Sequence, residues 1–225
     1  MSNINIIYRT SFGPAAFAFN PADIGVKNPV PATALLYYDD NSGKNGATCA
    51  THWTVGDYSY QDGCNGGAVG TIVSGSDLID GVVFPDGSKS VLFFGRHGDT
   101  YCYGTGGASG GDCYDPESSD KGLHGYPYHY RIWAYNADDL AAVKAGTKNP
   151  WEVAPYAYWN VTFPIPGWKY YIDGATYDST NKRIYVSMDH GDSSAPLIQV
   201  FSVNVTAGGT SDTTPPAAPR GLAVR

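Results

Sequence analysis

One segment of this chain occurs twice, without a gap. Residues 78–100, LIDGVVFPDGSKSVLFFGRHGDT, align with residues 171–193, YIDGATYDSTNKRIYVSMDHGDS, so that residue 80 matches residue 173. Both copies have Ile-Asp-Gly near the start, a lysine in the middle and His-Gly-Asp near the end. In each copy two runs rich in β-branched and aromatic residues flank a polar turn, which predicts a strand–turn–strand unit. Such units cannot bury both faces alone, so the repeat constrains the fold more than any other feature.

Further strands are expected around these units. One follows each copy, over residues 130–135 and 197–203, so that each copy becomes an antiparallel meander. A fainter third copy is expected near the start, where AAFAFNPAD and ATALLYYDD show the same rhythm, and PWEVAPYAYWNVTFP alternates enough to supply inner strands. The one convincing helix covers residues 137–144, with Asn136 as its N-cap. The sequence therefore predicts an all-β chain of repeated antiparallel meanders.

Repeated meanders of three or four strands are typical of a β-propeller. The stretch GATYDSTNKRIYVS, followed by PLIQVFSV, resembles blades of bacterial extracellular propeller proteins that precede immunoglobulin-like modules. This resemblance implies a propeller-like fold and an extracellular location, and it implies no defined activity. Blades usually recur at about 40–50 residues. The two copies lie farther apart in the sequence, which implies either a further blade between them or an insertion over residues 101–129. We expect a partial propeller of three to four blades, with a β-sandwich as the alternative.

Composition agrees with many short strands and argues against some classes of partner. The chain has 28 Gly, 18 Tyr and 15 Pro, and only 16% of its 225 residues are charged; Gly and Pro favour turns, and Tyr favours half-buried strands. The net charge is −7, without clustered Lys and Arg, which argues against nucleic acid. The sequence contains no apolar run long enough for a membrane span. We expect neither nucleic acid binding nor membrane insertion.

The four cysteines form two local pairs. Cys49 and Cys64 enclose one Gly-rich polar loop, and Cys102 and Cys113 enclose another. Local pairing into two disulfides is expected, although four cysteines allow three connectivities. No CxxC knuckle or histidine at zinc-ligand spacing accompanies them. Disulfides persist outside the cytosol, so we expect a secreted or cell-surface protein.

The end of the chain predicts a domain boundary. A small polar linker begins at residue 208, and residues 212–225, DTTPPAAPRGLAVR, resemble the opening strand of a fibronectin type III or related immunoglobulin-like domain. The expected organisation is a repeat region over residues 1–207 and, over residues 208–225, a linker with the start of a truncated fibronectin type III-like domain. A disordered Pro-rich terminus is the alternative. Without a recognisable signal peptide at the start, the chain is expected to be an internal fragment of a larger exported protein.

The His-Gly-Asp motifs are the first candidate site. Because the motif recurs at the same place in both copies, His97 with Asp99 and His190 with Asp192 are expected in equivalent loops on one face. A histidine and a carboxylate can act as base and orienter or bind a metal. The alternative is structural, with a glycine at positive φ and an aspartate that caps the loop.

The second candidate is the repeated Asp-Gly at the start of each copy. Asp80 and Asp173 could face one central pocket, as paired carboxylates do in glycosidases, at separations of about 5–5.5 Å for retention or about 6.5–9.5 Å for inversion. Asp-Gly is also an ordinary turn pair, so strand-edge capping is the alternative.

The third candidate is the aromatic loop between Asp99 and residue 130. Tyr101, Tyr126 and Tyr128 are expected to stack on a sugar or dock a partner, because tyrosine is a rigid amphipathic contact residue. The alternative is that these rings cover a small core of the loop itself. The leading function is thus a non-catalytic recognition or scaffold module that binds a glycan or a protein; the alternative is a carbohydrate-active hydrolase that uses Asp80 and Asp173.

No cofactor is required by any motif. The acidic run of the same loop offers oxygen ligands of the kind that calcium prefers, although it lacks EF-hand spacing and a solvated loop is the favoured interpretation. Its members are Asp112, Asp115, Glu117 and Asp120.

Overall fold

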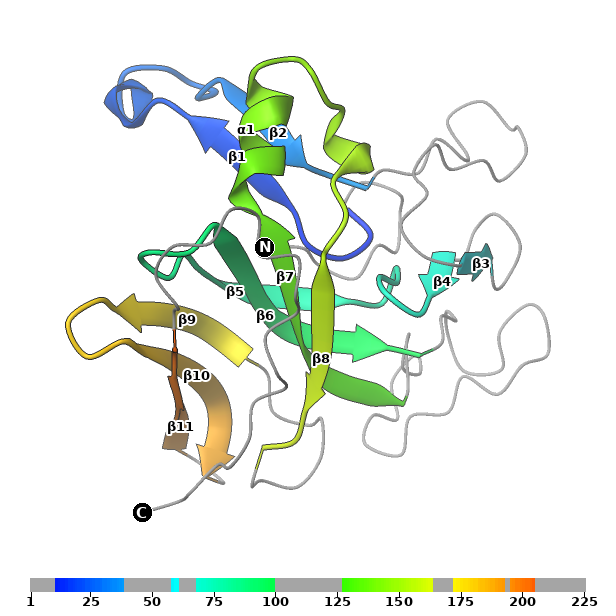
Figure 1. Ribbon diagram of the computed structural model, residues 1–225, viewed down its shortest axis with the longest axis vertical. Helices are drawn as coiled ribbons and strands as arrows, with labels where there is room; N and C mark the ends of the chain where they lie inside the picture. Colours follow the sequence, from blue (N-terminus) through cyan, green and yellow to red (C-terminus); the bar gives the residue numbers. More distant parts are fainter. Residues whose placement is uncertain are drawn as a thin grey trace.

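The chain is mostly β-structure in antiparallel sheets, as the sequence predicts. The computed structural model describes residues 11–38, 58–60, 68–99, 127–163, 172–192 and 195–204. A four-stranded sheet in the order β5-β6-β7-β8 lies at the centre (Figure 1). Its strands are β5 (Leu78–Val83), β6 (Ser90–Gly98), β7 (Tyr128–Asn136) and β8 (Ala157–Val161).

Smaller sheets accompany the central one. A three-stranded sheet has the order β11-β10-β9, from β9 (Ile172–Asp178), β10 (Arg183–Asp192) and β11 (Ala195–Ser202). Two hairpins complete the described strands: β1 (Ala16–Phe19) with β2 (Ala32–Leu36), and β3 (Tyr58–Tyr60) with β4 (Ala68–Gly70). In Figure 1 the β1–β2 hairpin and the helix α1 (Ala137–Lys144) lie at one end of the molecule, and the three-stranded sheet lies at the other.

The two matching segments fold into hairpins with the same pairing register. Gly81 pairs with Phe94 in the first hairpin, and Gly174 pairs with Ser187 in the second. Both registers shift one residue earlier, so that Asp80 and Asp173 are each the extra residue of a β-bulge. The expectation that both segments are strand–turn–strand units is confirmed by these ladders.

The turns between the paired strands differ despite the matching sequence. In PDGSK the positive φ falls on Gly87, at 75°, whereas in DSTNK it falls on Lys182, at 53°. A positive φ costs glycine little and costs lysine more. Asp178 compensates in the second turn, where its carboxylate accepts hydrogen bonds from the N–H groups of Thr180 and Asn181.

Alternation along β6 and β7 creates two separate cores. Phe93 and Trp133 face one side of the central sheet and pack with residues of β2, α1 and the segment around Val153. Phe94 and Ile132 face the other side and pack with the inner face of β9, β10 and β11. The central sheet is therefore covered on both faces, by the β1–β2 hairpin with α1 on one and by the three-stranded sheet on the other.

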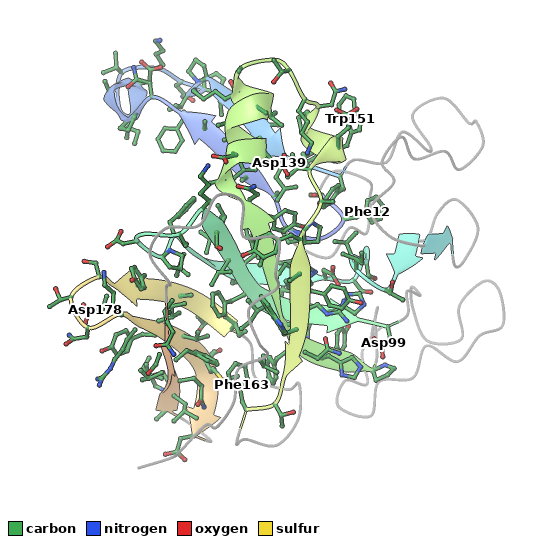
Figure 2. The ribbon with its side chains drawn as sticks, in the orientation of Figure 1. Phe12, Asp99, Asp139, Trp151, Phe163 and Asp178 are labelled. Carbon is green, nitrogen blue, oxygen red and sulfur yellow. The ribbon has the colours of Figure 1, made fainter. Side chains whose placement is uncertain are left out.

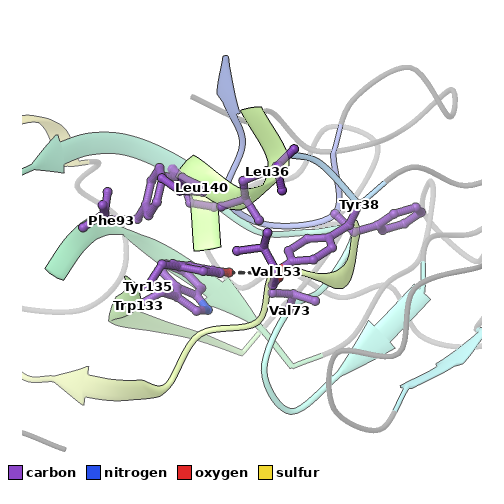
Figure 3. Packing of buried hydrophobic residues seen from close by; sticks show 12 residues of the cluster. Leu36, Tyr38, Val73, Phe93, Trp133, Tyr135, Leu140 and Val153 are labelled. Atoms are coloured by element: carbon purple, nitrogen blue, oxygen red, sulfur yellow. Dashed lines mark hydrogen bonds between the residues drawn. The ribbon is translucent and has the colours of Figure 1, made fainter. Parts of the chain in front are cut away.

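A tyrosine pair fixes the first core around a backbone carbonyl (Figure 3). Tyr38 donates a hydrogen bond to the Val153 carbonyl at 2.5 Å, and a hydrogen bond of 3.1 Å joins the Tyr38 and Tyr135 hydroxyls. Burial raises the pKa of both hydroxyls far above the usual value, because the phenolate would lose its hydration. The two rings thus remain neutral donors inside an otherwise apolar cluster.

The helix forms where the sequence predicts it. The Asn136 side chain accepts a hydrogen bond from the Asp138 N–H at 2.9 Å, so it caps the first turn of α1. Leu140 and Val143 are the buried residues of the helix and pack in the first core. The strands expected after each copy, in the third copy near the start and within residues 150–164 are also present, as β7, β11, β1–β2 and β8.

Two expectations about loops are wrong. His97 and Gly98 lie in β6, and the second His-Gly-Asp lies in β10, so neither motif is a loop. Glycine is required in the second motif by close approach, since a Cβ on Gly191 would come 2.4 Å from that of Leu197. The expected end of the insertion at residue 129 is also wrong, because Tyr128 and His129 already pair in β7, and residues 101–126 lie outside the described residues. The described strands form no closed ring, and the linker from residue 208 lies outside the described residues.

Close approach of β5 and β9 generates the first testable prediction. A Cβ on Gly81 would lie 2.8 Å from the Ala175 Cβ and 3.0 Å from its backbone nitrogen, whereas a Cβ on Gly174 would meet nothing within 4 Å. Gly81→Ala is therefore expected to lower the free energy of unfolding by about 1–3 kcal/mol through overpacking. Gly174→Ala, the matched control, should leave it unchanged or raise it by up to about 1 kcal/mol. Urea denaturation measures both, and equal effects would contradict the close approach.

Candidate functional site

A buried aspartate–histidine pair lies at the end of β6. His97 is 2% exposed, and its Nδ1 lies 2.7 Å from Oδ1 of Asp77, whose side chain is fully buried. Asp77 also accepts hydrogen bonds from the N–H groups of Ser74, at 2.8 Å, and Gly98, at 3.3 Å. A carboxylate can only accept hydrogen bonds, so Nδ1 of His97 is assigned the hydrogen and donates a hydrogen bond to Asp77. His97 is thereby fixed in orientation, with Nε2 directed away from Asp77.

The segment 71–77 that supplies Asp77 is bound across the sheet by two side chains of β7. Arg131 donates to the carbonyls of Thr71, at 2.6 Å, and Ile72, at 3.3 Å. The indole N–H of Trp133 also donates to the Ile72 carbonyl, at 2.6 Å. These bonds place the start of the segment over β7 and Asp77 over His97 on β6. The segment is therefore a scaffold for the polar end of the sheet.

A second aspartate–histidine pair lies beside the first and is open to solvent. Asp99 follows β6 (Figure 2), and its Oδ2 accepts a hydrogen bond from Nε2 of His129 at 2.8 Å. His129 pairs with His97 across the β6–β7 ladder. The side chains of Asp99 and His129 are 39% and 42% exposed. Nε2 of His97 lies 3.9 Å from Oδ1 of Asp99, which is beyond hydrogen-bonding distance.

An exposed tyrosine lies on the same face of the sheet, opposite Trp133 and four residues along β7 from His129. Tyr158 is 40% exposed on the edge strand β8, and the guanidinium of Arg131 lies 4.7 Å from its ring centroid. Arg131 also donates from Nε to Oδ1 of Asn160 at 2.8 Å. We call Asp99, His129, Arg131, Tyr158 and Asn160 the polar rim. The Tyr158 ring of this rim packs against the guanidinium of Arg131. The exposed polar groups of the rim can donate and accept hydrogen bonds.

Burial lowers the pKa of Arg131, because the charged guanidinium loses hydration. The nearby negative charges of Asp77 and Asp99 act in the opposite direction. Arg131 is 4% exposed, so its guanidinium binds groups of the protein and is hardly accessible to solvent.

The two bulge aspartates form a separate acidic pair. Partial burial raises the pKa of Asp80, the charge of Asp173 raises it further, and the charge of Arg96 lowers it. Asp80 is half-buried and Asp173 is exposed. The close approach of Gly81 to Ala175 brings β5 and β9 together next to these residues. The negative charge of Asp173 thus favours the protonated form of Asp80.

The structure brings together some of the residues predicted from sequence and separates others. His97 and Asp99 are neighbours, whereas Asp192 ends β10 in the three-stranded sheet, where it pairs with Ala195. Tyr128 is only 6% exposed and lies under the guanidinium of Arg96, 4.1 Å from the ring centroid. The remaining predicted residues lie outside the described side chains: His190, Tyr101, Tyr126, Asp112, Asp115, Glu117, Asp120 and Cys49, Cys64, Cys102, Cys113.

Sequence analysis missed Asp77 and the rim residues of β7 and β8. Asp77 lies three residues before the repeated Asp80 and has no distinctive motif around it. His129 and Arg131 reach the site only through the register of β7 on β6, across a segment of 29 residues between Asp99 and His129 that hides this pairing in the sequence. Alternation in YAYWNV could have pointed to Tyr158 and Asn160 as one face of a strand.

No group of three His, Cys, Asp or Glu side chains could hold a metal ion in the part of the chain that the structure describes. Within the same residues, every helix is too short or too polar to cross a membrane. No family model, curated protein or solved structure matches this chain.

The buried Asp77–His97 pair generates the second prediction. In Asp77→Asn the amide would present N–H groups to the Ser74 N–H or to Nδ1 of His97, and one buried donor would lose its acceptor. We expect the free energy of unfolding to fall by about 2–4 kcal/mol. Asp138→Asn, which removes an exposed ion pair with Lys89, is the control and should cost less than about 1 kcal/mol. Urea denaturation compares the two, and similar small losses would show that the buried pair is unimportant for stability.

Proposed function

We propose that this chain is a non-catalytic recognition module of a secreted or cell-surface protein, and that it binds a glycan or protein ligand at the polar rim. The observation that carries the proposal is the exposed Tyr158 ring, which is backed by Arg131 and lies on β8 with Asn160, on the face of the sheet that also carries His129. Tyrosine offers a large contact area at little entropic cost, and Arg131 reduces that cost further by holding the ring. The rim also adjoins the loop after Asp99.

The loop between Asp99 and Pro127 strengthens the choice of this face. A backbone hydrogen bond of 3.0 Å from the Asp99 N–H to the Pro127 carbonyl closes the base of the loop. The loop thus leaves and returns at the rim, and its tyrosines, including Tyr101 and Tyr126, are expected to extend the same binding surface. Long loops within compact β domains are commonly functional. The proposed disulfide between Cys102 and Cys113 would hold this loop, in agreement with an extracellular location.

We propose a partial β-propeller of three to four blades as the fold behind this function. Three features support it: the shared register of the two hairpins, the coverage of the central sheet on both faces, and the approach of β5 to β9 at Gly81. Blades of a propeller pack face to face, and their innermost strands converge near the axis. A two-sheet β-sandwich is the alternative architecture.

An array of glycans and extracellular proteins tests the recognition proposal. The wild-type chain is expected to bind at least one ligand, and Tyr158→Ala should weaken that binding about two- to tenfold, from the value of a stacked aromatic. Phe84→Ala is the control, because Phe84 is 60% exposed but follows β5, the edge strand opposite to β8 in the central sheet. Retention of no ligand by the wild type, or equal binding by wild type and Tyr158→Ala, would refute the proposal.

A carbohydrate-active hydrolase that uses Asp80 and Asp173 is the second candidate. It is favoured by the placement of both carboxylates on equivalent bulges and by the raised pKa of Asp80. Bulges often occur next to active sites, where they re-aim a side chain. In this mechanism the half-buried Asp80 would protonate the leaving group, and the exposed Asp173 would act as nucleophile or base.

The hydrolase candidate has a test that also reports on pH. Asp80→Asn and Asp173→Asn should each lower the release of reducing sugar from a polysaccharide by about 100-fold or more. Because the folded state raises the pKa of Asp80, the folded state binds this proton more tightly than the unfolded state. Stability from this group therefore falls as pH rises through the folded pKa, and Asp80→Asn should raise the melting temperature at neutral pH but not at a pH below 3.8. If Asp80→Asn raises the melting temperature and the wild type releases no reducing sugar, the hydrolase is excluded and the two aspartates are a structural pair.

A further inference from the structure

We infer that this chain binds a second molecule of itself head to tail, with the outer face of the three-stranded sheet in one molecule against the outer face of the β1–β2 hairpin in the other. The outer face of each layer is the one that points away from the central sheet. The two faces lie at opposite ends of the fold, with the central sheet between them (Figure 1). This contact goes beyond the recognition function and uses other surfaces than the polar rim.

The internal repeat gives the layers a direction. In the first hairpin, β5–β6, the face that carries Phe94 contacts the three-stranded sheet. The residue that matches Phe94 in the second hairpin, β9–β10, is Ser187, and it pairs with Gly174 as Phe94 pairs with Gly81. Because side chains alternate along β10 and Val186 points into the core, Ser187 lies on the outer face. The face that contacts the next layer in the first hairpin is thus the outer face in the second.

Two matching glycines distinguish the covered face from the open one. A Cβ on Gly81 would lie 2.8 Å from the Ala175 Cβ, because β9 approaches β5 at this point. Gly174 holds the matching position in the second hairpin, and a Cβ on it would meet nothing within 4 Å. A glycine inside a strand weakens the strand and often marks a site of close backbone approach. Gly174 therefore indicates that a further layer packs on the outer face.

The outer face of the three-stranded sheet is apolar and uncharged across its two middle rows. Ile198 is 50% exposed and Val200 is 43% exposed. The terminal layer of a stacked repeat usually has a polar outer face, which keeps the protein soluble. This end has no such polar cover, so it suits contact with another layer. The side chains of the two rows are Thr176, Tyr185 and Val200 in one and Gly174, Ser187 and Ile198 in the other.

The opposite end of the fold exposes aromatic rings. Phe17 and Phe19 of β1 are each 51% exposed, and they pair with Ala34 and Ala32 of β2. Ala16 packs against the first core, and side chains alternate along β1, so both rings point away from the central sheet. This end of the stack therefore also lacks a polar cover.

Shape and charge match the two ends to each other. The rings of Phe17 and Phe19 project from the hairpin, whereas the sheet face has small side chains beside Gly174 and can receive a ring. Neither set of residues is charged, so their contact would bury no unpaired charge. The central sheet separates the two ends within one molecule, so a second molecule is needed to join them. Such a heterologous contact forms a closed ring or an open chain of molecules.

Sedimentation velocity of the full chain tests this contact with two variants that each alter one end. Phe19→Lys places a charge on the hairpin face, and Ile198→Lys places one on the sheet face. The wild type is expected to self-associate as its concentration rises. Each variant alone should associate about tenfold more weakly or less, because a lysine in the interface would lose hydration. Phe84→Lys, which changes a 60% exposed ring outside both faces, should associate like the wild type.

A mixture of the two variants distinguishes contact between unlike faces from contact between like faces. Phe19→Lys keeps an intact sheet face, and Ile198→Lys keeps an intact hairpin face. The mixture should therefore form a heterodimer through one intact interface and grow no further.

Three results would overturn the inference: a wild type that remains monomeric at about 1 mM, a mixture that remains monomeric, or one variant that associates alone as strongly as the wild type. The last result would indicate contact between like faces. Circular dichroism verifies that each variant is folded. Phe17→Lys and Val200→Lys alter the same two faces and replace a variant that does not fold.

Discussion

The ladder between β6 and β7 is the interaction on which the rest of this structure depends. It joins Ser90 to Asn136 at one end and Gly98 to Tyr128 at the other without interruption. Because side chains alternate along it, Phe93 and Trp133 serve one core while Phe94 and Ile132 serve the other. A slip of one residue would exchange the two faces and place each apolar set opposite the wrong layer. The same register brings His129 beside His97 and so creates the polar end of the sheet.

Burial of charge at that end follows from the same constraint. His97 and Arg131 lie on the face of the first core, where neither could remain without partners. The segment 71–77 supplies them: carbonyl oxygens for Arg131 and the carboxylate of Asp77 for His97. Its role is therefore structural, since it holds the buried groups that contact the exposed Asp99 and Tyr158. A rigid polar surface of this kind suits recognition, where little ordering is needed when a ligand binds.

The acidic pair on β5 and β9 illustrates a second consequence of repetition. Two copies of Ile-Asp-Gly give two β-bulges, and the approach of the strands brings like charges within mutual influence. Such an arrangement costs stability at neutral pH, in proportion to the raised pKa of Asp80. It is the kind of feature that persists either because a reaction uses it or because the bulge itself is needed where two sheets converge. The absence of a side chain at Gly81 favours convergence as one reason, because a Cβ there would collide with Ala175.

By itself, the sequence determined the local structure of this protein. Strand alternation, turn residues and the cap at Asn136 act over a few neighbouring residues, so β5–β6, β9–β10 and α1 could be predicted with their positions. Asp80 and Asp173 were marked by repetition, and His97 and Asp99 by their shared motif. Only the tertiary structure decided that His97 is buried against Asp77, that Tyr128 lies under Arg96 and that Tyr158 stands at the surface. The physical reason is that these contacts join segments about 20 to 60 residues apart through strand register and sheet packing, whose choice depends on burying two cores at once rather than on any local preference.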